Sequence, residues 1–421
     1  MGNGANMSVS RDMPAARKNS QSAWRPPRLG MDIWLIIVVF TLLMFGLLMV
    51  YSSSTDYSMV VLGEAPSYMF RKQVIFALIG IVVAAFLALF DYHRFRKWAI
   101  PIIVFTIIGL AVVLFVNEVI NNAARTLFQG SGQPSEVAKL AVVIYLAVWL
   151  FARKEQLGSV SFGLLPLSVI LGIIGGLILL QPDLSATVTI FIIGGIMFFL
   201  AGGDLRQIVL FLVVGTLVGW VVFTFHPTGS QRLSEYVISI QDLTQAPLHL
   251  SRSLEALVKG SWFGVGIGRA ETKLTGLPVP PTDSIFAVIG EEVGILGSSM
   301  VVFLNVILLW RGLKIAQTAP DDLGKLLAAG LSIWLAVEAF INMAVIVGLV
   351  PFAGNALPFI SYGGSNLLVS LAAIGILINI SRVSAHSQEK EERSLNAVID
   401  LRRRDRRWGV SSSRRTKGTA G

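Results

Sequence analysis

A single acidic residue, Asp283, stands where a stiff polar segment meets a long apolar run. Residues 278–282 read Pro-Val-Pro-Pro-Thr, and the apolar run begins at Ser284. The prolines prevent the segment from joining the following helix early. A carboxylate held at such a mouth can act as a general base for an attacking hydroxyl group. Thr282 or Asp283 can also cap the helix, a role worth about 1 kcal/mol, and the two roles are compatible.

Other charged residues lie in or beside apolar stretches, where charge is costly and often functional. Glu136 and Lys139 are three residues apart, so they share one helical face. They can form a structural ion pair or a cationic wall for an anionic ligand. Asp183 follows Gln181 in a very short turn, where an aspartate can simply form the turn. Three further acidic residues lie inside the apolar runs: Glu291, Glu292 and Glu338.

Six cationic residues are expected on or near the same side of the apolar runs as Asp283. They are Arg125, Lys139, Arg252, Lys259, Arg269 and Lys273. Charged side chains of this kind form strong hydrogen bonds with phosphate and pyrophosphate groups. An anionic headgroup would therefore be attracted to this side, although each residue taken alone is also explained as a solvated loop charge.

Several kinds of chemistry are excluded by composition. The chain contains no cysteine and four scattered histidines, which rules out disulfides, thiolate sites and an HExxH zinc motif. The glycines of residues 264–268 do not form a dinucleotide-binding fingerprint, because Arg269 occupies the position of its third glycine and no βαβ unit surrounds them. We interpret them as a turn with close backbone approach.

The elements that must position these residues are membrane-spanning helices. Of the 421 residues, 54% are hydrophobic and 14% are charged, whereas soluble domains carry roughly 25% charged residues. Apolar runs of about 20 residues cross the hydrocarbon core as helices, and their lack of alternation argues against barrel strands. We therefore predict an all-α polytopic membrane protein with ten transmembrane helices. The predicted spans are residues 32–52, 73–90, 98–116, 136–152, 161–180, 184–201, 205–225, 284–310, 326–350 and 362–381.

The distribution of positive charge predicts the orientation. Most of the 34 Lys and Arg residues fall on the side that carries both chain ends, so the positive-inside rule predicts cytoplasmic termini and an extracytoplasmic Asp283. The first span is predicted to be retained as an anchor. We expect a disordered cytoplasmic tail at 1–31, the membrane domain at 32–382 and a basic cytoplasmic tail at 383–421. That last tail is either solvated or held to anionic membrane lipids, and no nucleic-acid partner is predicted.

One large extracytoplasmic loop, residues 226–283, joins the seventh and eighth spans. Leu250, Leu254 and Leu257 recur at helical spacing after Pro247, and Gly260 is a suitable helix stop. This pattern predicts an amphipathic helix. Such a helix can lie on the membrane surface or pack against the protein itself.

Five motifs occur in order along the chain. They are Gln133–Pro134–Ser135–Glu136 with Lys139, Gln181–Pro182–Asp183–Leu184, residues 262–268 (WFGVGIG), Thr282–Asp283 with residues 285–294 (IFAVIGEEVG), and residues 357–365 (LPFISYGGS). Together they resemble the signatures of the SEDS proteins, the RodA/FtsW/SpoVE family, over about residues 32–382. The family pattern PEAHTD reads PVPPTD here, so a Glu and a His are replaced.

The resemblance implies a peptidoglycan glycosyltransferase that polymerises lipid II at the outer face of the bacterial cytoplasmic membrane. Such a protein acts with a class B penicillin-binding transpeptidase in elongation or division. It would have its catalytic residue at Asp283 and its substrate-binding residues at Arg125, Glu136, Lys139 and Asp183. No cofactor is demanded by the motifs, although a divalent cation, Mg or Mn, can bridge a pyrophosphate.

Two other functions are compatible with the same residues. A flippase or transporter of the lipid-linked precursor would also use intramembrane charges. A non-catalytic scaffold of the cell-wall synthesis complex would function without Asp283.

Overall fold

The computed structural model describes residues 30–120, 133–181, 183–225, 227–242 and 245–411. Their regular structure is helical, as predicted. The helices are α1 (Ile33–Val60), α2 (Tyr68–Leu89), α3 (Phe95–Ile120), α4 (Pro134–Ala152), α5 (Leu165–Leu180), α6 (Leu184–Leu200), α7 (Leu205–Phe225), α8 (Pro227–Gln241), α9 (Leu248–Gly260), α10 (Ile285–Thr318), α11 (Asp322–Ile346) and α12 (Gly364–Ser411).

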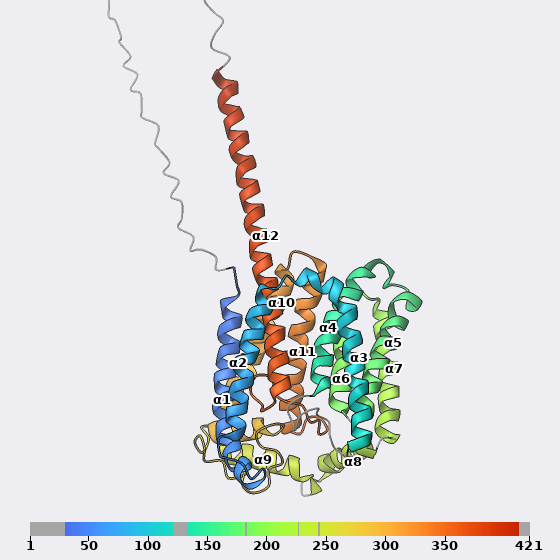
Figure 1. The fold of residues 1–421 in the computed structure, drawn as a ribbon, viewed down its shortest axis with the longest axis vertical. Helices are drawn as coiled ribbons and strands as arrows, with labels where there is room; N and C mark the ends of the chain where they lie inside the picture. The colour runs from blue at the N-terminus through green and yellow to red at the C-terminus, as the bar shows by residue number, and fades with distance from the viewer. Residues whose placement is uncertain (1–29, 121–132, 182, 226, 243–244, 412–421) are drawn as a thin grey trace, which may run out of the picture.

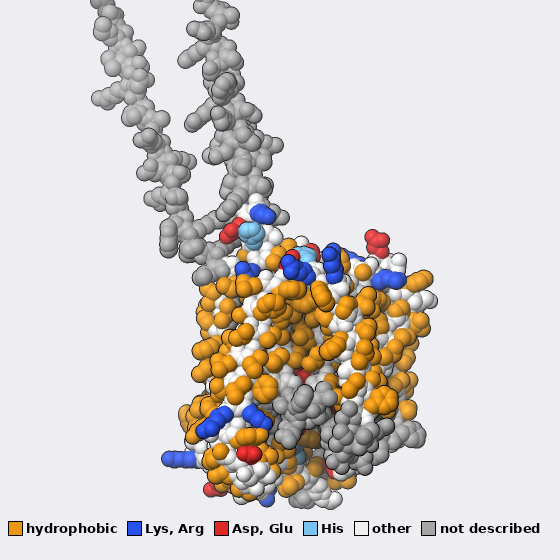
Figure 2. Space-filling model, in the orientation of Figure 1, with side chains coloured by type: hydrophobic (Ala, Val, Ile, Leu, Met, Phe, Trp, Pro, Cys, Tyr) orange, Lys and Arg blue, Asp and Glu red, His pale blue; other side chains and the backbone are white. Residues whose placement is uncertain are grey.

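The helices form an upright bundle with different ends. Helix α12 packs along α2, α10 along α11, and α3 along α4. Figure 1 shows α12 projecting far beyond one end of the bundle, while α8 and α9 lie across the other end. On the face shown in Figure 2, hydrophobic side chains form a broad band across the bundle, and charged groups are concentrated above and below it. This is the surface expected of a multi-pass membrane protein.

Eight described helices are long and apolar enough to cross a membrane. They are α1 to α5 and α10 to α12, two of them together with short flanking turns. The sixth and seventh predicted spans correspond to shorter apolar helices, residues 184–200 and 205–221. The eight longer spans are confirmed as candidates by length and composition, and the full set of ten stays a prediction.

The segment predicted to be extracytoplasmic contains two helices, whereas the sequence predicted one. Helix α9 ends at Gly260, as predicted, whereas α8 had no counterpart in the sequence prediction. Helix α9 buries a face of small residues, Ser253, Ala256 and Gly260, toward α10. A Cβ atom on Gly260 would lie 1.8 Å from the carbonyl oxygen of Gly290. This contact supports the interpretation that α9 packs against the protein.

Helix α10 is interrupted at Gly294, whose φ of 76° and ψ of −171° are not helical. The loop of residues 261–266 fills the interruption through four backbone hydrogen bonds. They are Val265 N–H to Glu291 O (2.9 Å), Gly266 N–H to Glu292 O (3.0 Å), Ile295 N–H to Ser261 O (2.9 Å) and Leu296 N–H to Trp262 O (3.3 Å). The close approach predicted for these glycines is confirmed. The loop thereby satisfies backbone groups that a continuous helix would pair by itself.

The tight α9–α10 contact yields a stability prediction. Gly260→Ala should lower the thermal midpoint of the detergent-solubilised protein, because the methyl group collides with backbone and overpacking costs about 1–3 kcal/mol. Gly109→Ala in α3 is the matched control, since its Cβ would meet nothing within 4 Å. Equal midpoints for the two variants would contradict the packing described here.

Candidate functional site

Asp283 lies in a turn whose backbone is fixed by the end of α11 and the loop that follows it. Three consecutive carbonyl groups accept hydrogen bonds: Pro281 O from Tyr362 N–H (2.8 Å), Thr282 O from Ser361 Oγ (2.8 Å) and Asp283 O from Asn342 Nδ2 (3.0 Å). Asn342 Nδ2 also donates to Asn355 O at 2.6 Å. The backbone of Asp283 is therefore held by α11 and by the loop that follows it.

The Asp283 carboxyl group is half-buried and faces the α11–α12 loop. A Cβ atom on Gly354 would lie 3.1 Å from Asp283 Oδ2, so a glycine leaves room for the carboxylate there. The cap of α10 is Ser284, and its side chain makes no capping hydrogen bond. The prediction that Thr282 or Asp283 caps this helix is therefore wrong.

His249 of α9 contacts the same turn through Ser284. Its Nε2 lies 3.0 Å from Ser284 Oγ, which also donates to Pro278 O at 2.6 Å. The imidazole packs against the Phe352 ring with centroids 4.3 Å apart. Burial lowers the pKa of His249 from 6.5 to about 4. The ring is therefore neutral at pH 7.

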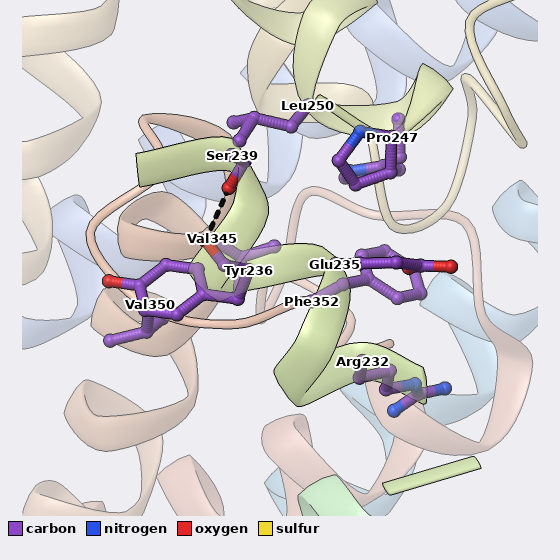
Figure 3. Close-up of a pocket in the computed structure, with 10 residues that line it drawn as sticks. Arg232, Glu235, Tyr236, Ser239, Pro247, Leu250, Val345, Val350 and Phe352 are labelled. Carbon is purple, nitrogen blue, oxygen red and sulfur yellow. Dashed lines mark hydrogen bonds between the residues drawn. The ribbon is translucent and has the colours of Figure 1, made fainter. Parts of the chain in front are cut away.

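A small cavity of about 80 Å³ lies beside His249 and is lined by residues of α8, α9 and the end of α11. In Figure 3, Arg232, Glu235 and Phe352 lie along one side of it. The Arg232 guanidinium stands 5.1 Å from the centroid of the Phe352 ring. Pockets for sugar-sized ligands usually measure roughly 300–1,000 Å³. This cavity is too small to hold such a ligand by itself.

Glu136 and Lys139 form a buried ion-pair cluster with Glu338. The Lys139 ammonium lies 2.9 Å from Glu136 Oε2 and also contacts Glu338 Oε1. The side chains of Lys139 and Glu338 are 3% and 1% exposed, so the ammonium is neutralised from within the protein. Asn366 Nδ2 adds a hydrogen bond to Glu136 Oε2 at 2.9 Å. This geometry favours the ion-pair interpretation over a bare cationic wall.

Asp183 caps α6 and ties it to the start of α4. Its Oδ1 accepts from Ala186 N–H (3.1 Å) and Ser185 Oγ (2.9 Å), while its Oδ2 accepts from Gln133 Nε2 (3.0 Å) and Ser135 Oγ (2.9 Å). Both carboxylate oxygens are thus satisfied by the protein. The Gln181–Leu184 motif therefore contacts the Gln133–Glu136 motif directly.

Helix α11 connects these clusters to Asp283. Glu338 and Asn342 are one turn apart on it, roughly 6 Å along the axis. The Lys139 cluster therefore lies about one helical turn from the residue that holds the Asp283 backbone. Glu338 could be singled out from the sequence as a charge inside an apolar run, but Asn342 and Asn366 were missed. Their only signal was an amide side chain within an apolar helix. Arg125 lies outside the described residues.

Glu291 and Glu292, adjacent on α10, are both buried but have different partners. Glu292 accepts from Ser52 Oγ (2.6 Å) and pairs with Lys273 at 3.0 Å. Glu291 accepts from Glu271 N–H at 2.9 Å and from Thr272 Oγ1. The two carboxylates therefore attach the loop of residues 271–273 to the bundle.

The predicted supply of external cations is largely paired within the protein. Arg252 lies 2.6 Å from Glu255, Lys259 lies 3.1 Å from the same carboxylate, and Lys273 is bound to Glu292. Arg269 is exposed. Most of these charges therefore hold the loop together instead of facing an open ligand site.

Comparison with known proteins identifies the family. A family model described as cell cycle proteins, FtsW/RodA/SpoVE, matches residues 33–386. The chain belongs to this family. Its relatives include a probable peptidoglycan glycosyltransferase FtsW from Trichlorobacter lovleyi, which is 37% identical over 83% of this chain and 93% of its own length. Stage V sporulation protein E of Bacillus subtilis is 35% identical over 84% of this chain and 98% of its own length.

Two solved structures share the fold. Rod shape determining protein RodA of Thermus thermophilus aligns with a TM-score of 0.62 at 24% identity, covering 85% of this chain and 98% of its own. A chain from a peptidoglycan synthase complex aligns with a TM-score of 0.68, also at 24% identity, covering 85% and 99%. At this identity the likeness establishes the helical arrangement.

The lowered pKa of His249 predicts a specific acid sensitivity. The unfolded chain protonates this ring near pH 6.5 and the folded protein near 4, so its stabilising effect is complete above 6.5 and is lost as the pH falls toward 4. The loss should reach about 2 kcal/mol at pH 5. His249→Gln should lose less stability than the wild type between about pH 7.5 and pH 5 in thermal melts.

The comparison of the wild type with His249→Gln contains its own control. Arg232 and Glu235 line the adjoining cavity and are unchanged in both proteins, so their contributions to stability cancel in the difference. Parallel acid-induced losses in wild type and variant would contradict the assignment of a buried, neutral His249.

Proposed function

We propose that this protein is a peptidoglycan glycosyltransferase that polymerises lipid II into glycan strands during cell-wall synthesis. One observation carries the proposal: a carboxylate, Asp283, lies at the end of the bundle that carries α8 and α9, on a backbone held by three consecutive hydrogen bonds. Such a fixed acid suits general-base catalysis on a membrane-bound substrate. The activity is also the one named for relatives that are 33–37% identical.

In the proposed reaction, the 4-hydroxyl group of an acceptor sugar attacks the anomeric carbon of a donor sugar. Asp283 accepts the hydroxyl proton as the new glycosidic bond forms, a contribution of roughly 10²–10⁴-fold. The bond to the lipid pyrophosphate breaks, and the pyrophosphate leaves with the electron pair. In-line attack inverts the anomeric centre.

We assign the substrate side of the site to Arg125, Glu136, Lys139 and Asp183. Arg125 would offset the charge of the leaving pyrophosphate. The other three fix the start of α4 and its junction with α6, directly after the segment that contains Arg125. Lys139 would act on the pyrophosphate as part of the neutralised cluster rather than as a free cation.

A divalent cation, Mg or Mn, would enter this site mainly on the substrate. Among the described residues there is no group of three or more His, Asp or Glu side chains that could hold a metal ion. Asp283 could contribute one oxygen to a cation bound by the pyrophosphate. Such an ion would neutralise phosphate charge when bound.

The proposed setting is the bacterial cytoplasmic membrane, with both termini in the cytoplasm and Asp283 outside. The excess of Lys and Arg near the chain ends supports this orientation, as does the location of α8 and α9 at the end opposite to the projecting α12. We further propose a class B penicillin-binding protein as partner. A chain with the same fold occurs in a peptidoglycan synthase complex that coordinates polymerisation and crosslinking.

The decisive variant is Asp283→Asn, which keeps the shape of the side chain and removes the base. Purified protein carrying it should fold and insert normally, yet show no polymer from lipid II on a glycan gel. Glu271→Gln is the matched control, because Glu271 is an exposed carboxylate in the same loop. Full glycan synthesis by Asp283→Asn would refute the proposal, and lipid II translocation without polymer would favour a flippase.

The role of the Lys139–Glu136–Glu338 cluster can be tested with variants that remove the lysine but leave no unpaired buried charge. Lys139→Met should destabilise the protein by about 3–5 kcal/mol, because it leaves two buried carboxylates without their cation. Adding Glu136→Gln and Glu338→Gln should restore the thermal midpoint. If Lys139 acts on the substrate, lipid II polymerisation should stay at least tenfold below wild type in this triple variant. Recovered polymerisation would assign the cluster a purely structural role.

A further inference from the structure

The turn that carries Asp283 contains a strained residue and is closed by a side chain. Val279 has a φ of 43°, a left-handed conformation that is strongly disfavoured for a β-branched residue. The Ser284 hydroxyl donates to Pro278 O at 2.6 Å and so joins the two ends of residues 278–284. Backbone strain of this kind persists only where surrounding contacts hold it.

The number of protons available determines which residue is the donor in the His249–Ser284 hydrogen bond. A serine hydroxyl has one proton, and in this turn that proton is directed to a carbonyl oxygen that can only accept. The 3.0 Å contact between Ser284 Oγ and His249 Nε2 must therefore have the imidazole N–H as its donor. A neutral ring protonated at Nε2 satisfies this requirement and agrees with burial that disfavours the charged form.

The same imidazole also contacts the segment on the other side of the carboxylate. Its ring packs on Phe352, two residues before Gly354, the residue that faces Asp283 Oδ2. His249 thus contacts the residue that follows Asp283 in the chain and the loop that lies in front of its carboxyl group. It comes from α9, an external helix that contributes no other hydrogen bond to this turn among the described residues.

We propose that His249 is a positioning residue, which holds the Asp283 turn closed through Ser284 and sets the α11–α12 loop against the carboxylate. This inference rests on the proposed role of Asp283 as the base. His249 acts through Ser284 and Phe352, not on the reacting atoms. Its loss displaces the carboxylate, and a displacement of about 1 Å can lower turnover roughly 10²-fold.

The test uses two replacements at one position. His249→Phe keeps an aromatic ring against Phe352 but removes the donor, whereas His249→Gln keeps an N–H donor at a similar reach. In lipid II polymerisation by the purified full chain, His249→Phe should lower kcat roughly 10–10²-fold with little change in KM. His249→Gln should stay within a few-fold of wild type, because it keeps the N–H donor. A purely space-filling role would give the opposite order, with His249→Phe the more active variant.

Ser284→Ala provides an independent route to the same conclusion. It should reproduce the fall in kcat, and it also removes the hydrogen bond from Ser284 to Pro278 O. The double variant with His249→Phe should be no slower than Ser284→Ala alone, because the His249–Ser284 contact is already lost in that single variant. His386→Phe, at an exposed histidine on α12, is the control for the substitution itself. Additive losses, wild-type kcat in His249→Phe, or failure of His249→Gln to restore turnover would each overturn the inference.

Failure of this inference is distinguishable from failure of the proposed function. Asp283→Asn is measured in the same assay. If it still polymerises lipid II, the proposed function itself falls, whatever the histidine variants do. If it is inactive while His249→Phe and Ser284→Ala turn over normally, only the positioning role is lost.

Discussion

The structure depends on pairing the backbone of two irregular segments that lie at the end of a membrane bundle. Unpaired carbonyl and amide groups cost several kcal/mol where water is absent, so irregular chain survives there only when other groups satisfy it. The turn before α10 meets this requirement with donors from Asn342, Ser361 and Tyr362. Because these donors come from α11 and the loop after it, the location of Asp283 is set by residues 59 to 79 positions away in the chain.

The break in α10 follows the same rule. Gly294 ends the first half of the helix, and the loop from Ser261 to Gly266 supplies the missing backbone partners. Glycines are needed at this crossing because a Cβ on Gly264 would lie 2.2 Å from Glu292 O. The loop between α9 and α10 is consequently part of the bundle, and the buried Glu292–Lys273 pair fastens it further.

The sequence was most informative where a pattern is local. Spans, the helix ending at Gly260 and the glycine turn could be predicted, because hydropathy, periodicity and glycine spacing are properties of short windows. The role of Ser284 as the cap could not, since Asp283 beside it is an equally good capping residue. The ion-pair partners of the loop lysines and arginines could not be predicted either. Lys273 is a loop lysine by sequence, and its partner lies 19 residues away on a helix. Amides such as Asn342 gave little local signal because their importance lies in what they reach across the bundle.

These contacts also explain why the buried charges lie so near the candidate base. A lysine with two carboxylates inside an apolar bundle is costly to assemble, and one member, Glu338, lies a single turn from Asn342 on α11. Any movement of α11 along its axis would disturb the ion pair and the Asp283 backbone together. The cluster therefore resists sliding of the helix that holds the carboxylate. Bulk packing alone would resist such sliding less, because apolar side chains tolerate small shifts that a charge with fixed partners does not.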